Sequence, residues 1–296
     1  MLKGRIANRR LYDYLASGVS GCVLAAFSGG VYLSLENETV MIHDVKNGFI
    51  PFGIAVSDFD GRGKSFGIEP EMQISVCQNI LVCNGANFQV ELGYEEPVVS
   101  KLALSDFALF SSTIPLIQEL HKRSALSVYS NADVCLVSKE CINDIFARAA
   151  YEGLSCLSDA IKLQNEVLIE TALDKLIGLG RGLTPSLDDF ICGMLFLMHL
   201  YERTTFEKLP WLELLSNAVI NSAGNKTNVY SAAYLQAAAR GEDFSALRSC
   251  IENISNDNAD KSINNVFQIG SSSGADMLCG MSFAANYIMK QRNFTQ

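Results

Sequence analysis

The chain has 296 residues, of which 49% are apolar and 19% charged, with 22 glycines and six prolines. This composition excludes collagen-like, low-complexity and wholly disordered chains, and the length suffices for one large or two modest domains. The formal net charge is −9; residues 1–101 carry eight basic and 11 acidic side chains, and residues 102–296 carry 15 and 21. Because nucleic acids bind clustered Lys and Arg, we expect no nucleic-acid partner.

The sequence also argues against secretion and membrane insertion. No apolar run follows the basic residues near the N-terminus, and the segment 190–201 has only 12 apolar or weakly polar residues, whereas a membrane span needs about 20. We therefore expect a cytoplasmic protein without a membrane partner. The nine cysteines form no C-x-x-C pair, and we interpret them as small core residues.

The first hundred residues show the pattern of a small β domain. A short helix is expected at 8–16, followed by short β-rich runs separated by Gly, Asn and Asp. Such spacing is typical of a small sandwich or barrel. The predicted strands are 21–27, 31–35, 39–43, 52–56, 73–77, 79–83 and 88–92.

Beyond residue 102 the apolar period becomes that of helices. The sequence predicts an α+β fold with a β-rich domain, residues 1–101, before a larger all-helical domain, residues 102–296. The predicted helices are 105–121, 139–152, 158–177, 185–201, 211–222, 229–239, 244–254 and 275–289.

Two similar stretches of the helical half stand out, 178–196 and 270–283. Each is a glycine-rich turn that leads into an apolar helix. When Ser186 is aligned with Ser273, six of eleven positions are identical. The identical pairs are Ser186/Ser273, Asp189/Asp276, Cys192/Cys279, Gly193/Gly280, Met194/Met281 and Phe196/Phe283.

The first stretch has the features of an anion-binding helix start. Thr184 before Pro185 fits an N-cap followed by proline at the first helical position. The glycines at 178, 180 and 182 permit positive φ and close approach of the backbone. Backbone N–H groups left unpaired there would bind phosphate or carboxylate, with Arg181 as an added clamp. The alternative is structural, because first-turn acids also complement a helix dipole and glycine-rich loops often only connect.

A third segment, 225–231, opens another predicted helix. Thr227 or Asn228 fits its N-cap position, with Lys226 beside it. Capping is the simpler role, and closing an anion site with the lysine and hydroxyls is the alternative. The sequence contains no H-x-x-x-H, G-x-S-x-G or P-loop motif.

At these three segments the chain resembles the AllH-type subunits of oxamate carbamoyltransferase. The family pattern of Gly-x-Gly-Leu-Thr-Pro-Ser-Gly-Asp-Asp, a Thr…Ser helix start and a late Gly-x-x-Ser-Gly-x-Asp is similar to residues 180–189, 227–231 and 270–276. The β-rich N-terminal region is also similar, so the resemblance covers roughly residues 15–290. One position departs from the pattern: Leu187 stands where the family has glycine, whereas the second stretch keeps Gly274.

The resemblance implies a carbamoyltransferase subunit that works with companion subunits in anaerobic allantoin (purine) catabolism. It implies small anionic substrates, carbamoyl phosphate and oxamate, with oxalurate as the carbamoylated product. Asp188, Asp189 and Asp276 are then the candidate catalytic residues, of which Asp189 and Asp276 would orient the amide, act as base or hold a metal ion. The candidate substrate- and anion-binding residues are Gly180, Arg181, Gly182, Thr184, Ser186, Lys226, Thr227, Ser231, Ser272, Ser273 and Gly274.

No cofactor is assigned from the sequence, and a divalent metal is left open. Leu187 leaves the substrate open as well, since its side chain would narrow the turn or block approach to the backbone. The alternative function is a non-catalytic scaffold or regulatory subunit that binds a small anion or a related carboxylate metabolite.

Overall fold

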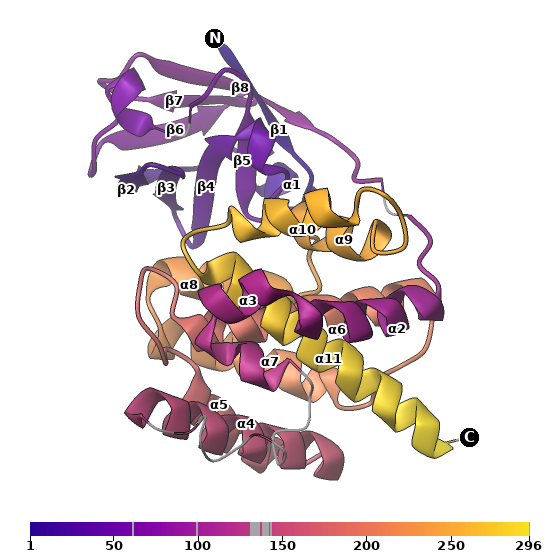
Figure 1. The fold of residues 1–296 in the computed structure, drawn as a ribbon. Helices are drawn as coiled ribbons and strands as arrows, with labels where there is room; N and C mark the ends of the chain where they lie inside the picture. The colour runs from indigo at the N-terminus through magenta and orange to yellow at the C-terminus, as the bar shows by residue number, and fades with distance from the viewer. Residues whose placement is uncertain (61, 99, 131–136, 138–141, 143, 296) are drawn as a thin grey trace. The chain divides into compact units, whose positions relative to one another are not determined.

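The α+β prediction is confirmed: an eight-stranded β-barrel precedes a helical region (Figure 1). The computed structural model describes residues 1–60, 62–98, 100–130, 137, 142 and 144–295, without the side chains of 293–295. The chain forms two compact units, one made of residues 1–99 and 242–246 and the other of residues 100–241 and 247–296. The return of five residues to the first unit was not predicted from the sequence.

The barrel closes in the strand order β1-β5-β4-β3-β2-β6-β7-β8. Its β4–β5 pair and its closing β1–β8 pair are parallel, and the other neighbours are antiparallel. The predicted strands are present within two residues at each end, and β1 is additional. The strands are β1 (Leu2–Ile6), β2 (Ser20–Phe27), β3 (Gly30–Leu35), β4 (Glu38–Asp44), β5 (Gly53–Val56), β6 (Gln73–Cys77), β7 (Ile80–Cys83) and β8 (Phe88–Tyr94).

Helix α1 (Arg9–Ala16) belongs to the barrel unit, as do the 3-10 turns η1 (Val45–Asn47) and η2 (Gly63–Phe66). The Asn8 side chain caps α1 by accepting from the Leu11 N–H at 3.3 Å. Leu11 and Leu15 lie on one face of the helix and are buried in the core of the unit. The capped, amphipathic pattern therefore explains why residues 9–16 form a helix here.

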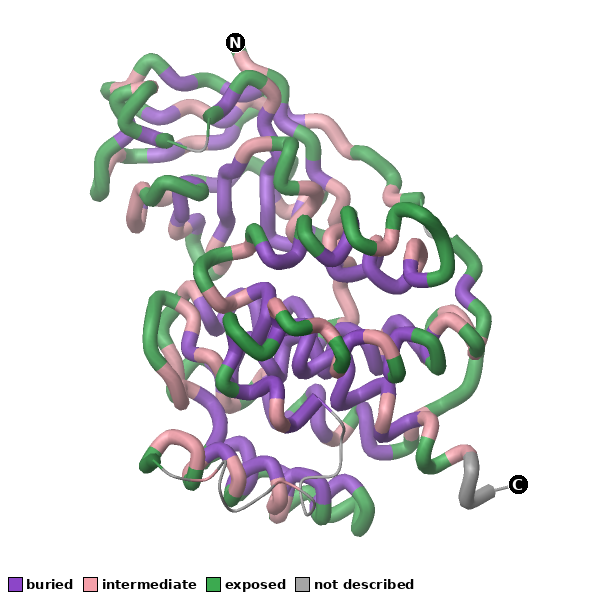
Figure 2. The backbone as a smooth tube through the Cα atoms, viewed as in Figure 1, coloured by how far each residue is buried: buried purple, intermediate pink, exposed green. Residues whose placement is uncertain are grey.

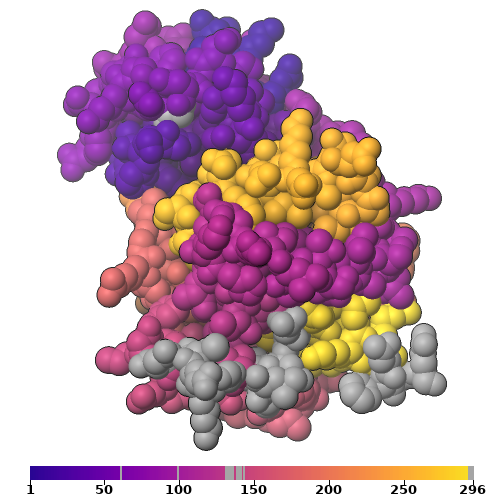
Figure 3. All heavy atoms as spheres, in the orientation of Figure 1, coloured from indigo at the N-terminus to yellow at the C-terminus, as the bar shows by residue number. Residues whose placement is uncertain are grey.

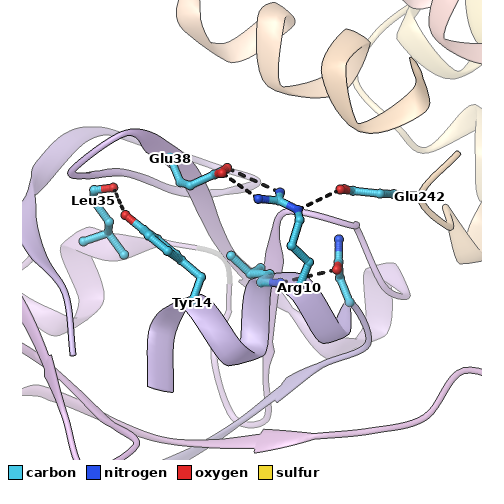
Figure 4. A network of polar contacts seen from close by, with 7 residues as sticks. Arg10, Tyr14, Leu35, Glu38 and Glu242 are labelled. Carbon is cyan, nitrogen blue, oxygen red and sulfur yellow. Dashed lines mark hydrogen bonds and ion pairs between the residues drawn. The ribbon is translucent and has the colours of Figure 1, made fainter. Parts of the chain in front are cut away.

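A polar network ties α1 to β4 and to the returning segment (Figure 4). The guanidinium of Arg10 contacts Glu38 at 2.5 Å and Glu242 at 3.1 Å. The Tyr14 hydroxyl donates to the Leu35 carbonyl at 2.6 Å. The segment 242–246 is also held by main-chain contacts, because the Ser245 N–H donates to the Phe49 carbonyl.

The second unit is helical. Its elements are α2 (Leu104–Thr113), η3 (Ile114–Leu116), α3 (Gln118–Arg123), η4 (Ala125–Tyr129), α4 (Ile145–Leu163), α5 (Glu166–Leu176), α6 (Ser186–Thr205), α7 (Leu212–Lys226), α8 (Val229–Ala239), α9 (Ser245–Glu252, which starts in the returning segment), α10 (Ala259–Phe267) and α11 (Ser273–Thr295).

Several predicted helix boundaries were wrong. The helix expected at 105–121 is interrupted at Pro115, which lies in a 3-10 turn. The break expected between 152 and 158 occurs instead at Gln164, which has φ of 50°, and at Asn165, which caps α5. Helix α10 was not predicted. Part of the expected helix 139–152 lies outside the described residues.

The cysteines agree only partly with the core prediction. Cys83, Cys192, Cys250 and Cys279 are buried, Cys77 is exposed, and all seven described cysteines are free thiols. Cys135 and Cys141 lie outside the described residues. None of the helices that the structure describes has the length and apolar character needed to cross a membrane.

Helices α6 and α11 form the centre of the helical unit, and Figure 2 shows buried residues concentrated along them. Every residue from 187 to 198 is buried. In Figure 3 the magenta side chains of α2 and α3 lie in front of α11, whose yellow C-terminal part emerges beside them. This covering is consistent with the packing of α2, α3 and η4 against α11.

The two central helices meet at equivalent glycines. A Cβ atom on Gly193 would overlap the Met277 carbonyl, and one on Gly280 would overlap the Phe190 carbonyl. In the alignment of the two stretches, Gly193 corresponds to Gly280 and Phe190 to Met277. The contacts are thus reciprocal, and the internal similarity of the sequence is a pseudo-twofold relation in space.

Candidate functional site

The helix starts of α6 and α11 bring together buried acids and hydroxyls. Asp189 and Asp276 occupy the fourth position of their helices, and each is 1% exposed. The Ser273 hydroxyl lies near Asp189, and the Ser186 hydroxyl lies near Asp276. Each serine therefore serves the acid of the other stretch, as the pseudo-twofold relation requires.

Asp189 has one occupied and one free carboxylate oxygen. The Thr184 hydroxyl lies 2.9 Å from Oδ2 of Asp189 and 2.9 Å from the Ser273 hydroxyl. Oδ1 is buried and has no hydrogen-bond partner among the described residues. Burial raises the pKa of Asp189 well above its ordinary value, and the charges of Asp276 and Asp188 raise it further. These effects favour the protonated form of Asp189.

Asp276 has the same arrangement with a different partner. Ser124, directly before η4, donates its hydroxyl to Oδ1. Oδ2 is buried and has no partner among the described residues. Burial raises the pKa of Asp276 to about 6, while the hydroxyls of Ser124, Ser186 and Ser272 act in the opposite direction. Asp276 is thus ionised at neutral pH and can accept a proton.

Asp188 has no free oxygen. Oδ1 accepts from the Gly178 N–H at 2.7 Å and Oδ2 from the Ser231 hydroxyl at 2.7 Å. Burial raises the pKa of Asp188, and the nearby Thr227 hydroxyl opposes this without reaching hydrogen-bond geometry. Asp188 therefore joins the glycine-rich loop to α8 and differs in chemistry from the other two acids.

The glycine-rich loop has the backbone that the sequence predicts. Gly178, Gly180 and Gly182 have φ of 84°, 134° and 105°. A Cβ on Gly180 would overlap the Ser186 nitrogen, and the Gly178 backbone lies against the Lys226 carbonyl. Positive φ and close contact together require glycine at 178 and 180.

The start of α6 differs from the prediction. Pro185, not Thr184, is the N-cap, because the Thr184 hydroxyl is directed to Asp189. The Leu187 N–H donates to the Leu179 carbonyl at 3.0 Å, and the N–H groups of Asp188 and Asp189 donate to the Pro185 carbonyl. Fewer backbone N–H groups are therefore left for an anion than the sequence suggested.

The two candidate cations have different surroundings. Arg181 is exposed within the glycine-rich loop. The Lys226 ammonium lies 3.1 Å from the Asp174 carboxylate in an exposed ion pair. Since Asp174 already occupies Lys226, Arg181 is the better placed cation for an anionic ligand.

Position 187 turns out to concern packing. The Leu187 side chain is fully buried. The equivalent Gly274 packs against α10, where a Cβ would overlap the Val266 carbonyl. The need for glycine at 274 thus comes from this close contact, whereas position 187 accommodates a leucine.

Asn228, one of the two expected caps, holds α8. Its Oδ1 accepts from the N–H groups of Tyr230 and Ser231 at 3.1 Å, and its Nδ2 donates to the Leu183 carbonyl at 2.7 Å. The Thr227 residue ends α7 instead. The third segment therefore fixes the glycine-rich loop against α8.

Sequence reasoning missed Ser124. It lies 152 residues before its partner Asp276, in a stretch without motif character, and no local signal marks it. Among the described residues, no group of three or more His, Cys, Asp or Glu side chains is arranged to hold a metal ion.

Comparison with known proteins gives one family. No solved structure matches the chain. Residues 176–285 match the family described as oxamate carbamoyltransferase subunit AllH. The matched range contains all three motifs, the acids of α6 and α11, and Ser231. The motifs and the family model therefore indicate the same family, the AllH subunits of oxamate carbamoyltransferase. The model matches residues 176–285 of this chain.

Proposed function

We propose that this chain is a subunit of a cytoplasmic carbamoyltransferase that acts on oxamate and carbamoyl phosphate in allantoin degradation. In the reaction, the amide nitrogen of oxamate forms a bond to the carbamoyl carbon, and the bond from that carbon to the phosphate oxygen breaks. Phosphate leaves with the electron pair, and the amide nitrogen loses one proton. The product is oxalurate. Such a reaction needs an acceptor for the proton and donors for the developing charge on oxygen.

The observation that carries the proposal is the pair of buried, unpartnered carboxylate oxygens at the starts of α6 and α11, Asp189 Oδ1 and Asp276 Oδ2. A buried polar atom without a partner costs free energy, and in a native fold it is typical of a ligand or catalytic site. The family match of the same helices supports assigning these oxygens to carbamoyl transfer.

The pKa values of both acids are raised, and we assign the two acids different roles. Asp276, whose pKa is about 6, is ionised above that pH and accepts the amide proton. Asp189, whose pKa is raised well above the ordinary range, keeps its proton and donates a hydrogen bond to a ligand carbonyl. A carboxamide presents an N–H and a C=O on one planar group, which matches this pair of acceptor and donor.

We assign the anionic parts of the substrates to the surrounding loop and helix starts. Arg181 supplies the positive charge, and the backbone of Gly180, Gly182 and Gly274 with the hydroxyls of Thr184, Ser186, Ser272 and Ser273 supplies polar contacts. Lys226 and Thr227 take a secondary part at the edge, and Asp188 with Ser231 positions the loop.

The test is a carbamoyl-transfer assay on the chain purified with its companion subunits. Asp276→Asn and Asp189→Asn are each expected to lower kcat by about 10²- to 10⁴-fold, as loss of a general acid or base does. Asp159→Asn is the matched control, since Asp159 is an exposed acid of α4 that pairs with Lys162, and neither residue belongs to the candidate site. Full activity of both site variants would refute the catalytic assignment. If these fully active variants also still bind oxamate, the result would support the non-catalytic scaffold instead.

A further inference from the structure

We infer that Ser124 is a positioning residue for Asp276: its hydroxyl occupies Oδ1 of that acid and leaves Oδ2 free to face the ligand. The inference rests on the proposed function and adds a residue from outside the family-matched range 176–285.

The hydrogen bonds of Ser124 fix the direction of its proton. Its hydroxyl oxygen accepts from the Leu126 N–H at 3.0 Å and its proton points to Oδ1 of Asp276. The Ser124 N–H donates to the Leu120 carbonyl at 3.0 Å, and the residue is 3% exposed. Backbone contacts on both sides therefore hold the hydroxyl as a donor to Asp276.

This single donor distinguishes the two oxygens of Asp276. Oδ1 is occupied, so Oδ2 is the oxygen left to take the amide proton of the ligand. A hydrogen bond to the carboxylate favours its charged form and opposes the effect of burial. Ser124 thereby favours the ionised form of Asp276, together with the hydroxyls of Ser186 and Ser272.

Other groups also face Asp276, and Ser124 is the one whose hydroxyl lies in hydrogen-bond contact with Oδ1. The Ser186 and Ser272 hydroxyls lie near it and also favour the charged form. The side chains of Asp189 and Cys279 also interact electrostatically with Asp276. Both are acidic groups, so neither supplies a positive charge. No cation is among the groups that shift the pKa of Asp276, so its ionisation depends on these hydroxyls.

The proton balance of the step follows from this geometry. As the amide nitrogen bonds to the carbamoyl carbon, its N–H proton passes to Oδ2 of Asp276, and the phosphate leaves with the electrons of the broken carbon–oxygen bond. The proton on Oδ2 is then released to the departing phosphate or to water. Ser124 exchanges no proton in the step.

The experiment titrates Asp276 directly and compares the result with catalysis. Aspartate carboxyl carbons are labelled with ¹³C in the full chain, and the Asp276 signal is assigned by its loss in Asp276→Asn. Ser124→Ala is expected to raise the pKa of Asp276 by about one pH unit, which is about tenfold in its ionisation constant. Ser124→Cys keeps the size with a weaker donor and is expected to give a smaller shift in the same direction, while Ser124→Thr restores the original value.

The matched control is Ser130→Ala. Ser130 is a buried serine that follows η4 and donates to the Ser127 carbonyl at 2.7 Å, not to an acid. It is expected to leave the titration of Asp276 unchanged.

The catalytic readout is the pH profile of kcat in the complex with companion subunits. The acid limb of the profile is expected to move upward with the titrated pKa in Ser124→Ala, so that activity recovers as the pH is raised. An unchanged Asp276 titration in both Ser124→Ala and Ser124→Cys overturns the inference, as does a loss of activity that is the same at every pH. Full activity of Asp276→Asn, in contrast, refutes the catalytic role that the proposed function gives to Asp276.

Discussion

Replacing Asp276 by Asn is expected to gain stability relative to the wild type as the pH rises, while it removes the function. The carboxyl is 1% exposed, its Oδ2 has no partner among the described residues, and its pKa is raised from 3.8 to about 6. Burial of an ionised carboxylate costs free energy that a neutral amide does not incur. The Asn retains an oxygen to accept the Ser124 hydroxyl, so the existing hydrogen bond survives.

The magnitude follows from proton linkage. A raised folded-state pKa means that the folded chain binds the proton more tightly than the unfolded chain. Its stabilising contribution is fully present below pH 3.8 and is lost as the pH rises through about 6. At about 1.4 kcal/mol per pH unit the whole loss is about 3 kcal/mol, of which about 2 kcal/mol falls between about pH 4.5 and about pH 8.

The assay is urea unfolding of wild type and Asp276→Asn at these two pH values. Any pH-independent cost of the unsatisfied amide cancels when the difference at low pH is subtracted from that at high pH. We expect the variant to gain about 2 kcal/mol on the wild type across the interval. Asp260→Asn, an exposed first-turn acid of α10, is the control and is expected to show little pH dependence. A constant difference between wild type and Asp276→Asn would refute the reasoning that burial raises this pKa.

Three further changes test the fold that supports the site. Gly280→Ala is expected to destabilise the fold by at least about 1–3 kcal/mol, because the added Cβ meets a backbone carbonyl. Gly224→Ala in α7 has open space around it and should stabilise the fold by about 0.5–1 kcal/mol. Thermal unfolding compares the two variants. Burial lowers the pKa of His43 from 6.5 to about 4, so the stability that His43 contributes falls by about 3 kcal/mol as the pH decreases through this interval. His43→Gln should therefore flatten the curve of unfolding free energy against pH in this interval. Arg10→Gln should speed hydrogen exchange of the amide at 245 by breaking the network of Figure 4, while Arg9→Gln, whose ion pair lies within α1, should leave it unchanged.

Local chemistry predicted much of the barrel and several helix starts. Asn8 and Asn228 cap their helices because a short amide side chain reaches the N–H groups of the first turn, which depends on neighbouring residues alone. The glycines at 178, 180 and 182 adopt positive φ for an equally local reason. Such features follow from spacing, and spacing is visible in one sequence.

Boundaries failed where the deciding contact is distant or the stop signal is weak. A break was predicted between residues 152 and 158, yet Gly153 packs closely against Leu176 and lies inside α4. The real break is Gln164 in the left-handed region, a residue without strong turn preference. Thr184 has the local character of a cap, but the buried carboxyl of Asp189 takes its hydroxyl instead. The deciding contact is distant in sequence at Gly153, whereas Gln164 carries a weak signal and the partner of Thr184 lies five residues further along the chain.

The internal repeat explains both the similarity and the difference of the two site acids. The sequence repeat places Asp189 and Asp276 at equivalent helix positions, and the reciprocal glycine contacts bring the two helix starts together. A strictly symmetric site would give both acids the same surroundings and one shared chemistry. The symmetry is broken by hydroxyls: Thr184 comes from the loop just before α6, the helix that carries Asp189, whereas Ser124 reaches Asp276 from another part of the chain.

The charge of each acid adds to the difference. Asp189 carries the coulombic influence of both Asp276 and Asp188, and its pKa is raised well above the ordinary range, whereas that of Asp276 is about 6. Two acids that titrate apart can divide the work of donor and acceptor on one planar amide. The repeat therefore supplies the geometry, and the residues outside it supply the asymmetry on which carbamoyl transfer would depend.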